Sequence, residues 1–389
     1  MVLALLFGIA YSFGLLSCAY SRRERRFYIN NLLMIWCIGM TITVTIGSAK
    51  QLYAAYNDDK INLANAETLY YYISIVGVVL SYICQLVQTT ELREFLSNVP
   101  LFEILDYFEL KRSVVKSSIQ IILVKTVVFP IILEINLLIR QSRNEPEESL
   151  LKTFYTLFPT VVSNFLPNCA FSSIVVCYHT MRTLNLRLEK IEKEANFYQD
   201  VKQIILHKRF YRMQKFCNLA DTLDELSQKY TLICGYTLRY VDINSVAIMA
   251  TLLCNLFAIT GGLFQEYNAL ADTFINKENY DVFDALTNGV FLSIAVADIA
   301  LYGSMANDCL EAVHETSIIL KRIQINNCDI RFRQSVEKFS LQIFVENFKI
   351  QPLGMLEINV GLLHDVLSAV TSFLLILIQS DLTLRFSLK

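Results

Sequence analysis

The sequence predicts an all-α integral membrane protein with seven transmembrane helices, and three observations lead to this fold class. Apolar residues occupy 54% of the 389 positions and charged residues only 18%, whereas soluble domains carry about 25% charged residues. The mean hydropathy is +0.42. A soluble chain of this length should divide into domains at polar linkers, and the sequence contains no such linker. The net charge of −2 also argues against a basic nucleic-acid binder.

Seven segments have the length and apolar character of membrane-spanning helices. A helix needs about 20 mostly apolar residues to cross the hydrocarbon layer. Its backbone polar groups must pair within the helix, because lipid offers them no partner. The predicted spans lie at about 28–49, 68–90, 117–139, 154–178, 243–265, 282–304 and 358–380.

A further apolar run, MVLALLFGIAYSFGLLSCAY, opens the chain. A signal peptide begins with positive charge, but here the basic stretch SRRERR follows the run. If the run were a span, only about six residues would separate it from the span at 28–49. We therefore expect residues 1–26 to form a cytoplasmic N-terminal segment with a helix lying at the membrane surface. A membrane-spanning helix remains the alternative.

The Lys and Arg residues predict the orientation, because cytoplasmic loops are enriched in both. With seven spans, 25 of the 34 basic residues fall on the side that carries the N-terminus, and eight fall on the other side. The long segment 179–242 supplies eleven of the 25 and counts less in this rule, but the balance without it is still 14 to eight. The N-terminus is therefore predicted to be cytoplasmic, and the C-terminal tail, residues 381–389, extracellular.

The segments 179–242 and 305–357 have the pattern of charged helices with apolar stripes. Leu184, Leu188 and Ile191 follow helical spacing in the first. A second stripe runs through Phe210, Met213, Phe216 or Cys217, Ala220, Leu223 and Leu226. An isolated helix with a bare apolar stripe would aggregate. The stripes therefore favour a packed cytoplasmic anchor, made of extensions of the fourth to seventh helices, over separate solvated loops.

Several functional classes lack their sequence signals. Seven-helix receptors that couple to G proteins tend to carry a D-R-Y-like triplet and an N-P-x-x-Y motif, whereas the corresponding spans here read LLIRQSR and SAVTSFLLILIQS. Secondary transporters show internal repeats. The sequence shows no such repeat, and seven spans divide poorly into two halves. No HExxH, GxSxG or phosphate-binding loop indicates an enzyme. A secondary transporter or a G-protein-coupled-type receptor of the plasma membrane remains the alternative to the function inferred below.

Cysteine and histidine patterns indicate neither a disulfide framework nor a metal site. None of the ten cysteines forms a CxxC pair. The four histidines (His179, His207, His314 and His364) have no metal-ligand spacing. We expect no cofactor.

The last 80 residues carry a family resemblance. Ser372 and Phe373 precede five apolar residues and then Gln379 and Ser380. This order is similar to the T-Y-(five apolar)-Q-F pattern of the last helix of insect gustatory receptors, with Ser for Thr, Phe for Tyr and Ser for the final Phe. Upstream, FSLQI (339–343), LGMLEIN (353–359) and CLEAVHET (309–316) resemble further elements of that family.

The resemblance implies a ligand-gated, nonselective cation channel that responds to a small-molecule tastant such as a sugar or a bitter compound. Such receptors place four subunits, identical or mixed, around one pore lined by the last helix, here 358–380. The anchor, 305–357, would join the subunits. The bundle of residues 27–304 would hold the ligand pocket in its extracellular half. The expected location is the plasma membrane of sensory neurons.

The seventh span carries a mostly polar stripe. Ser368, Thr371, Ser372, Leu375 and Gln379 follow i, i+3, i+4, i+7 and i+11 spacing, which places them on one helix face. Polar groups in a bilayer helix face water or protein, so the stripe alone fits either a pore wall or a helix–helix seam. The resemblance favours the pore, with Leu375 as a hydrophobic constriction. Ser380 replaces the family's aromatic residue, and Asp381 is either a pore-mouth acid or a solvated helix end.

Other polar residues lie within the spans. Lys125 and Glu134 should face opposite sides of the third span, and Lys125 lies at the depth of Asp298, with which an ion pair is expected. The pocket candidates, named for their position near the extracellular side, are Tyr71, Glu134, Tyr155, Asp284 and Asn288. Ordinary interfacial tyrosines and structural pairs are the alternative interpretation.

Overall fold

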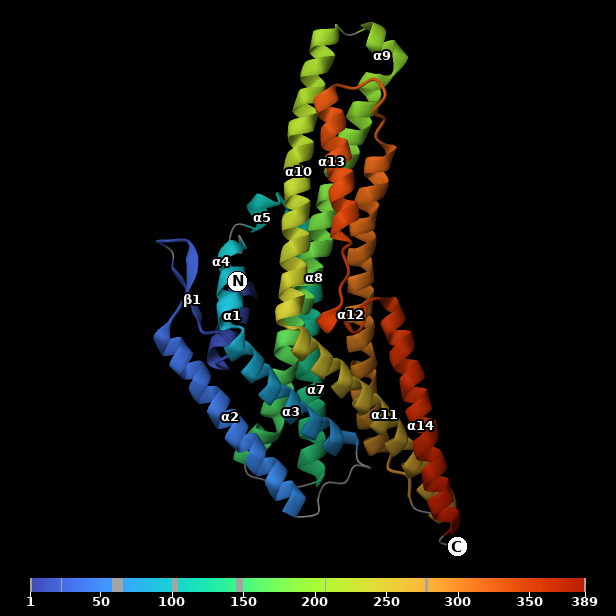
Figure 1. Cartoon of the computed structure of the whole chain (residues 1–389). Helices are drawn as coiled ribbons and strands as arrows, with labels where there is room; N and C mark the ends of the chain where they lie inside the picture. The colour runs from blue at the N-terminus through green and yellow to red at the C-terminus, as the bar shows by residue number, and fades with distance from the viewer. Residues whose placement is uncertain are drawn as a thin grey trace.

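The structure is a computed structural model and consists almost entirely of helices, with a membrane-type bundle at one end and a long helical anchor at the other (Figure 1). The described residues are 2–21, 23–57, 66–99, 104–144, 150–206, 208–276 and 279–387. Six described helical segments are long and apolar enough to cross a membrane, and a seventh, α3, qualifies together with α4 across a 68° bend. All seven predicted spans therefore fall on observed helices.

The N-terminal segment contains a helix, as predicted, but also a hairpin that the all-α prediction did not include. Helix α1 (Val2–Ser12) is followed by strands β1 (Cys18–Ser21) and β2 (Arg26–Ile29), which pair antiparallel. Residues 23–25 of the basic stretch lie in the turn of this hairpin, where Arg25 adopts a φ of 52°. The Ser97 hydroxyl donates to the Phe27 carbonyl and accepts from the Phe27 N–H, both at 3.1 Å, which joins the hairpin to α4.

The second and third helices pack beside this segment. Helix α2 (Asn31–Asn57) corresponds to the first span and α3 (Ala66–Val87) to the second. After the bend, α4 (Thr89–Asn98) runs along the end of the bundle nearest the anchor, followed by the short α5 (Ile104–Tyr107). The linker after α5 is held to the anchor by Glu109, which pairs with Arg187 and lies 3.5 Å from the Lys229 ammonium. The Arg187 hydrogen bond lowers the pKa of Glu109.

The third span is a helix with an inserted π-turn. Its parts are α6 (Arg112–Leu123), the π-helix η1 (Val124–Val128) and α7 (Phe129–Asn144). Pro130 lies directly after the π-turn. A proline supplies no N–H and its ring crowds the carbonyl four residues earlier, which here belongs to Thr126 within the π-turn. The wider turn relieves that conflict and turns Lys125 into the bundle, where it is 1% exposed.

The anchor is built by helices that continue out of the bundle, as the sequence predicted (Figure 1). Its helices are α8 (Leu150–Gln199), α9 (Val201–Leu206), α10 (Arg209–Ile243), α12 (Val282–Arg322) and α13 (Ile330–Glu346). The predicted stripe residues from Leu184 to Ile191 and from Phe216 to Leu226 are buried in its core. Phe210 and Met213 are exposed instead, because they lie in the first turns of α10, before the helix enters this core at Phe216.

The fifth and seventh spans complete the bundle. Helix α11 (Ser245–Asn276) follows α10 after a break at Asn244. Helix α14 (Val360–Ser387) follows the short 3₁₀ turn η2 (Pro352–Gly354). It extends beyond the predicted end of the seventh span, so residues 381–387, which the sequence assigned to a tail, are helical. The N- and C-termini lie toward opposite ends of the bundle (Figure 1).

Candidate functional site

Helix α14 lies at the edge of the bundle, against α11 and α12 (Figure 1). Within the most apolar 18-residue stretch of α14, only 11% is buried. The corresponding share is 56% for α8 and for α11. Leu362 and Val370 are 2% exposed and mark the covered side. Gly303 of α12 permits the close approach at the start of α14, because a Cβ there would lie 2.7 Å from the Asn359 carbonyl oxygen. Most of the other described side chains of α14 are exposed or half-buried.

The predicted stripe lies on that uncovered side. Ser368, Thr371, Ser372, Gln379 and Ser380 are all exposed, and Leu375 is 54% exposed. Two of the hydroxyls donate to carbonyls one turn earlier on the helix, Thr371 to Leu367 at 2.8 Å and Ser372 to Ser368 at 3.0 Å. Their oxygens can still accept hydrogen bonds. A lone subunit would therefore present this polar face to lipid, which is unfavourable.

Asp381 does not lie on the stripe. Its carboxylate accepts from Arg385 Nε at 2.6 Å and from the Tyr267 hydroxyl of α11 at 3.2 Å. Arg385 also bonds Asp272 of α11 at 2.5 Å. These contacts hold the end of α14 to α11 and balance the Asp381 charge within the subunit. They explain why the helix continues past the predicted boundary, and they separate Asp381 from the other predicted pore residues.

Two of the predicted pocket residues make contacts between helices at the bundle end opposite the anchor. Asp284 of α12 lies 3.7 Å from the guanidinium of Arg140 of α7, which is 3% exposed. Asn288 is 1% exposed and donates to the Gly262 carbonyl at 2.9 Å and to Glu266 at 2.6 Å, both on α11. Both residues therefore help to hold α7, α11 and α12 together.

Of the remaining pocket candidates, only Glu134 has a side chain in the described part of the structure. Glu134 is half-buried on α7. The side chains of Tyr71 and Tyr155 fall outside the described part of the structure. The grouping of the five candidates into one pocket therefore stays a prediction.

The predicted ion pair between Lys125 and Asp298 is confirmed. The Lys125 ammonium also lies 5.2 Å from the ring centres of Phe171 and Tyr302, an arrangement that favours a cation. Asn255 donates to the other Asp298 oxygen at 3.2 Å. Each charge of the pair thus has further stabilising partners, the aromatic rings for Lys125 and Asn255 for Asp298, as buried charges require.

A small cavity of about 30 Å³ borders this ion pair, enough for one or two waters. Three asparagines in its lining, Asn164, Asn168 and Asn255, were not singled out from the sequence. Asn164 and Asn168 are one helical turn apart within a span that carries no charged residue, and polar amides are expensive in that setting. That signal could have identified them.

The fold and these contacts define a multi-pass membrane protein with polar contacts inside its bundle, a helical anchor and a last helix that is largely exposed at the edge of the chain. A family model described as 7tm chemosensory receptor matches residues 3–384. The chain belongs to the 7tm chemosensory receptor family.

Two relatives come from Drosophila melanogaster. "Putative gustatory receptor 94a" is 40% identical over 99% of this chain and 96% of its own length. "Putative gustatory receptor 97a" is 34% identical over 97% of this chain and 89% of its own length. The predicted resemblance to gustatory receptors is therefore confirmed.

The solved structure of the olfactory receptor OR5 from the insect Machilis hrabei has the same fold. It superposes with a TM-score of 0.60 at 10% identity, over 96% of each chain. The same receptor in complex with eugenol superposes with a TM-score of 0.58 at 11% identity, over 97% of each chain.

Proposed function

We propose that this chain is a subunit of a ligand-gated, nonselective cation channel that responds to a small-molecule tastant. The observation that carries the proposal is the exposed polar stripe of α14, from Ser368 to Gln379, on a helix that the rest of the subunit hardly covers. A polar face in a bilayer needs water or protein beside it. A pore at the centre of several subunits supplies both.

In the proposed assembly four copies, identical or mixed with other gustatory receptor subunits, place their α14 helices around one axis. Gln379 supplies amide groups near the pore end that lies away from the anchor. Leu375 lies one turn deeper and forms an apolar ring that can close the pore by dewetting. Asp381 pairs with Arg385 on the side of α14 that faces α11, so the proposed pore wall is built from the stripe without an acidic ring of Asp381. Cation entry would depend on the dipoles of the stripe.

The small-molecule ligand is supported by relatives rather than by one cavity of this chain. The two Drosophila relatives are named as gustatory receptors, and the receptor of the same fold was solved in complex with eugenol. The cavity beside Lys125 and Asp298 is too small for such a molecule in this conformation. Ligand binding there would have to move α7, α8, α11 and α12 apart, which would also displace α14 through α11 and α12.

The proposed orientation places the anchor and the N-terminus in the cytoplasm and the end of α14 outside the cell. The basic hairpin turn and the basic residues of the anchor lie on the anchor side of the bundle, as the positive-inside rule requires. The proposed location is the plasma membrane of sensory neurons. Epitope tags at both ends test the orientation: on intact cells the C-terminal tag should stain and the N-terminal tag should not.

The function is tested by recording membrane current from cells that express this chain, alone and with a second gustatory receptor subunit, during perfusion with sugars and bitter compounds. We expect an inward, weakly selective cation current. This current should persist when GTP inside the cell is replaced by a non-hydrolysable GDP analogue, which holds G proteins inactive. Surface-expressed protein whose responses all require G-protein turnover would contradict the proposal. Saturable uptake without channel conductance would instead indicate a transporter.

A further inference from the structure

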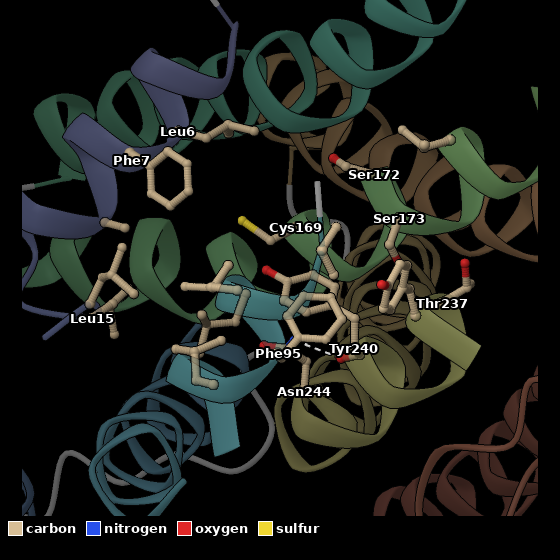
Figure 2. Close-up of a pocket in the computed structure, with 18 of the residues that line it drawn as sticks. Leu6, Phe7, Leu15, Phe95, Cys169, Ser172, Ser173, Thr237, Tyr240 and Asn244 are labelled. Atoms are coloured by element: carbon tan, nitrogen blue, oxygen red, sulfur yellow. Dashed lines mark hydrogen bonds between the residues drawn. The ribbon is translucent and has the colours of Figure 1, made fainter. Parts of the chain in front are cut away.

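A cavity of about 190 Å³ lies where the bundle meets the anchor (Figure 2). Its walls come from α1, the residues that follow α1, the end of α3, α4, the middle of α8 and the last turns of α10. None of the α14 stripe residues is among the lining residues, and neither are Lys125 and Asp298. The cavity is therefore separate from the proposed pore and from the mid-depth ion pair.

The walls of this cavity are held in place by specific bonds. The Tyr82 hydroxyl donates to the Phe13 carbonyl at 2.6 Å, and the Trp36 indole N–H donates to the Tyr11 carbonyl at 2.9 Å. Both bonds hold the N-terminal segment against the bundle. On the opposite wall the rings of Phe95 and Tyr240 stack with centres 5.0 Å apart. These contacts fix the positions of the elements that line the cavity.

The lining is mainly apolar, and a few hydroxyl groups gather on one side of it. Figure 2 shows Leu6, Phe7 and Leu15 on one side, and Ser172, Ser173 and Thr237 on the other. Ser173 and Ser172 donate to the Ala170 and Asn168 carbonyls at 2.7 and 2.9 Å. Their oxygens therefore remain acceptors for a donor group brought by a ligand.

The size and charge of the cavity define the ligand class. Among the described residues that line it, none is an Asp, Glu, Lys, Arg or His, and an ion without a partner is costly in such a setting. An apolar cavity of about 150 Å³ can hold benzene, so this one, of about 190 Å³, has room for an aromatic ring with a short substituent. We propose that the anchor-end cavity is a second ligand site, which binds a small neutral amphiphile with one hydrogen-bond donor, such as an alkylphenol.

The position of the cavity gives such a ligand a route to influence the channel. Asn244 lines the cavity and is also the break between α10 of the anchor and α11 of the bundle. Its amide donates to the Tyr240 carbonyl at 2.8 Å. A molecule bound here contacts the N-terminal segment, α4 and this joint together, so it would stabilise one relative arrangement of the three.

The test is photolabelling of the purified full-length chain with a phenol that carries a diazirine, followed by peptide mass spectrometry. Labelling should be saturable, should map to the residues around Cys169, Phe95 and Tyr240, and should be competed by 4-propylphenol. The anion 4-propylbenzoate should not compete. Ser173→Trp fills the cavity and should abolish the specific label, whereas the matched substitution Ser304→Trp, at an exposed serine of α12, should leave it unchanged.

A smaller change guards against misfolding of the tryptophan variant. The double substitution Ser172→Ala, Ser173→Ala removes the two acceptor oxygens from the wall and should weaken competition by 4-propylphenol about fivefold, the effect of one hydrogen bond. The same labelling with and without added phosphatidylcholine separates a free small molecule from a lipid chain. Unsaturable label, label at other sites, an unchanged label in Ser173→Trp, or label displaced by phosphatidylcholine but not by 4-propylphenol would each overturn the proposal.

Discussion

Replacing Lys125 with methionine should destabilise the bundle, because it leaves the Asp298 carboxylate without its cation. Lys125 is 1% exposed and the Asp298 side chain 23% exposed. Removal of one member of a buried pair costs about 3–5 kcal/mol. The partial exposure of Asp298 and its bond from Asn255 place the expected loss near about 3 kcal/mol, the lower limit of that range.

This loss corresponds to a measurable change in Tm. An unfolding entropy of about 2.1 cal/mol/K per residue gives roughly 0.8 kcal/mol/K for 389 residues. The expected decrease in Tm for Lys125→Met is therefore about 4 °C. It would be read as the loss of the monodisperse peak when detergent-solubilised protein is heated before size-exclusion chromatography.

The double variant Lys125→Met, Asp298→Asn provides the control. It removes both charges and keeps an acceptor for Asn255, so it should recover more than half of the loss, and the two changes should be clearly non-additive. Equal Tm values for Lys125→Met and the parent chain would refute the reasoning. A double variant less stable than the single variant would refute it as well.

Three further changes test other parts of the structure. Ser97→Ala removes both bonds to Phe27 and should lower the stability of the hairpin by about 1 kcal/mol, seen as roughly fivefold faster trypsin cleavage at the Arg23–Arg26 turn. Arg385→Ala releases Asp381 and Asp272 and should speed amide exchange in the last two turns of α14, while exchange around Leu362 stays unchanged. Because Arg187 lowers the pKa of Glu109, the contribution of Glu109 to stability is complete above its ordinary pKa of about 4.5 and is lost as the pH falls through the lowered value. Glu109→Gln should therefore lower Tm more at pH 7 than at pH 3; an equal difference at both pH values would contradict this assignment.

The spans and the anchor could be predicted because their signals are local. About twenty apolar residues in succession indicate a spanning helix whatever its neighbours are. The stripe from Leu184 to Ile191 likewise indicates a packed face at one element. The family motifs near Gln379 also lie close together in the sequence, so the resemblance could be stated from a short segment.

The candidate sites depended on contacts between distant segments, and these were harder to predict. The Lys125–Asp298 pair could be expected because few charges occur at that depth. The roles of Asp381 and Asn288 could not, because each is fixed by residues of α11 that the sequence does not mark as neighbours. The anchor-end cavity could not be predicted for the same reason, since its walls come from segments far apart in the sequence, from α1 to α10. The hairpin was missed because its four-residue strands were interpreted as part of an apolar run and a basic stretch.

The central claim, that the exposed stripe of α14 lines a cation pore, is tested most directly by thiol modification during an agonist-evoked current. Gln379→Cys lies on the stripe, and Ile378→Cys lies on the neighbouring, partly covered side. A membrane-impermeant, positively charged thiol reagent applied from outside should reduce the current through Gln379→Cys and leave Ile378→Cys and the parent chain unchanged. If the reagent leaves the Gln379→Cys current intact although biotinylation shows that the introduced thiol reacts, the stripe does not line the conducting path.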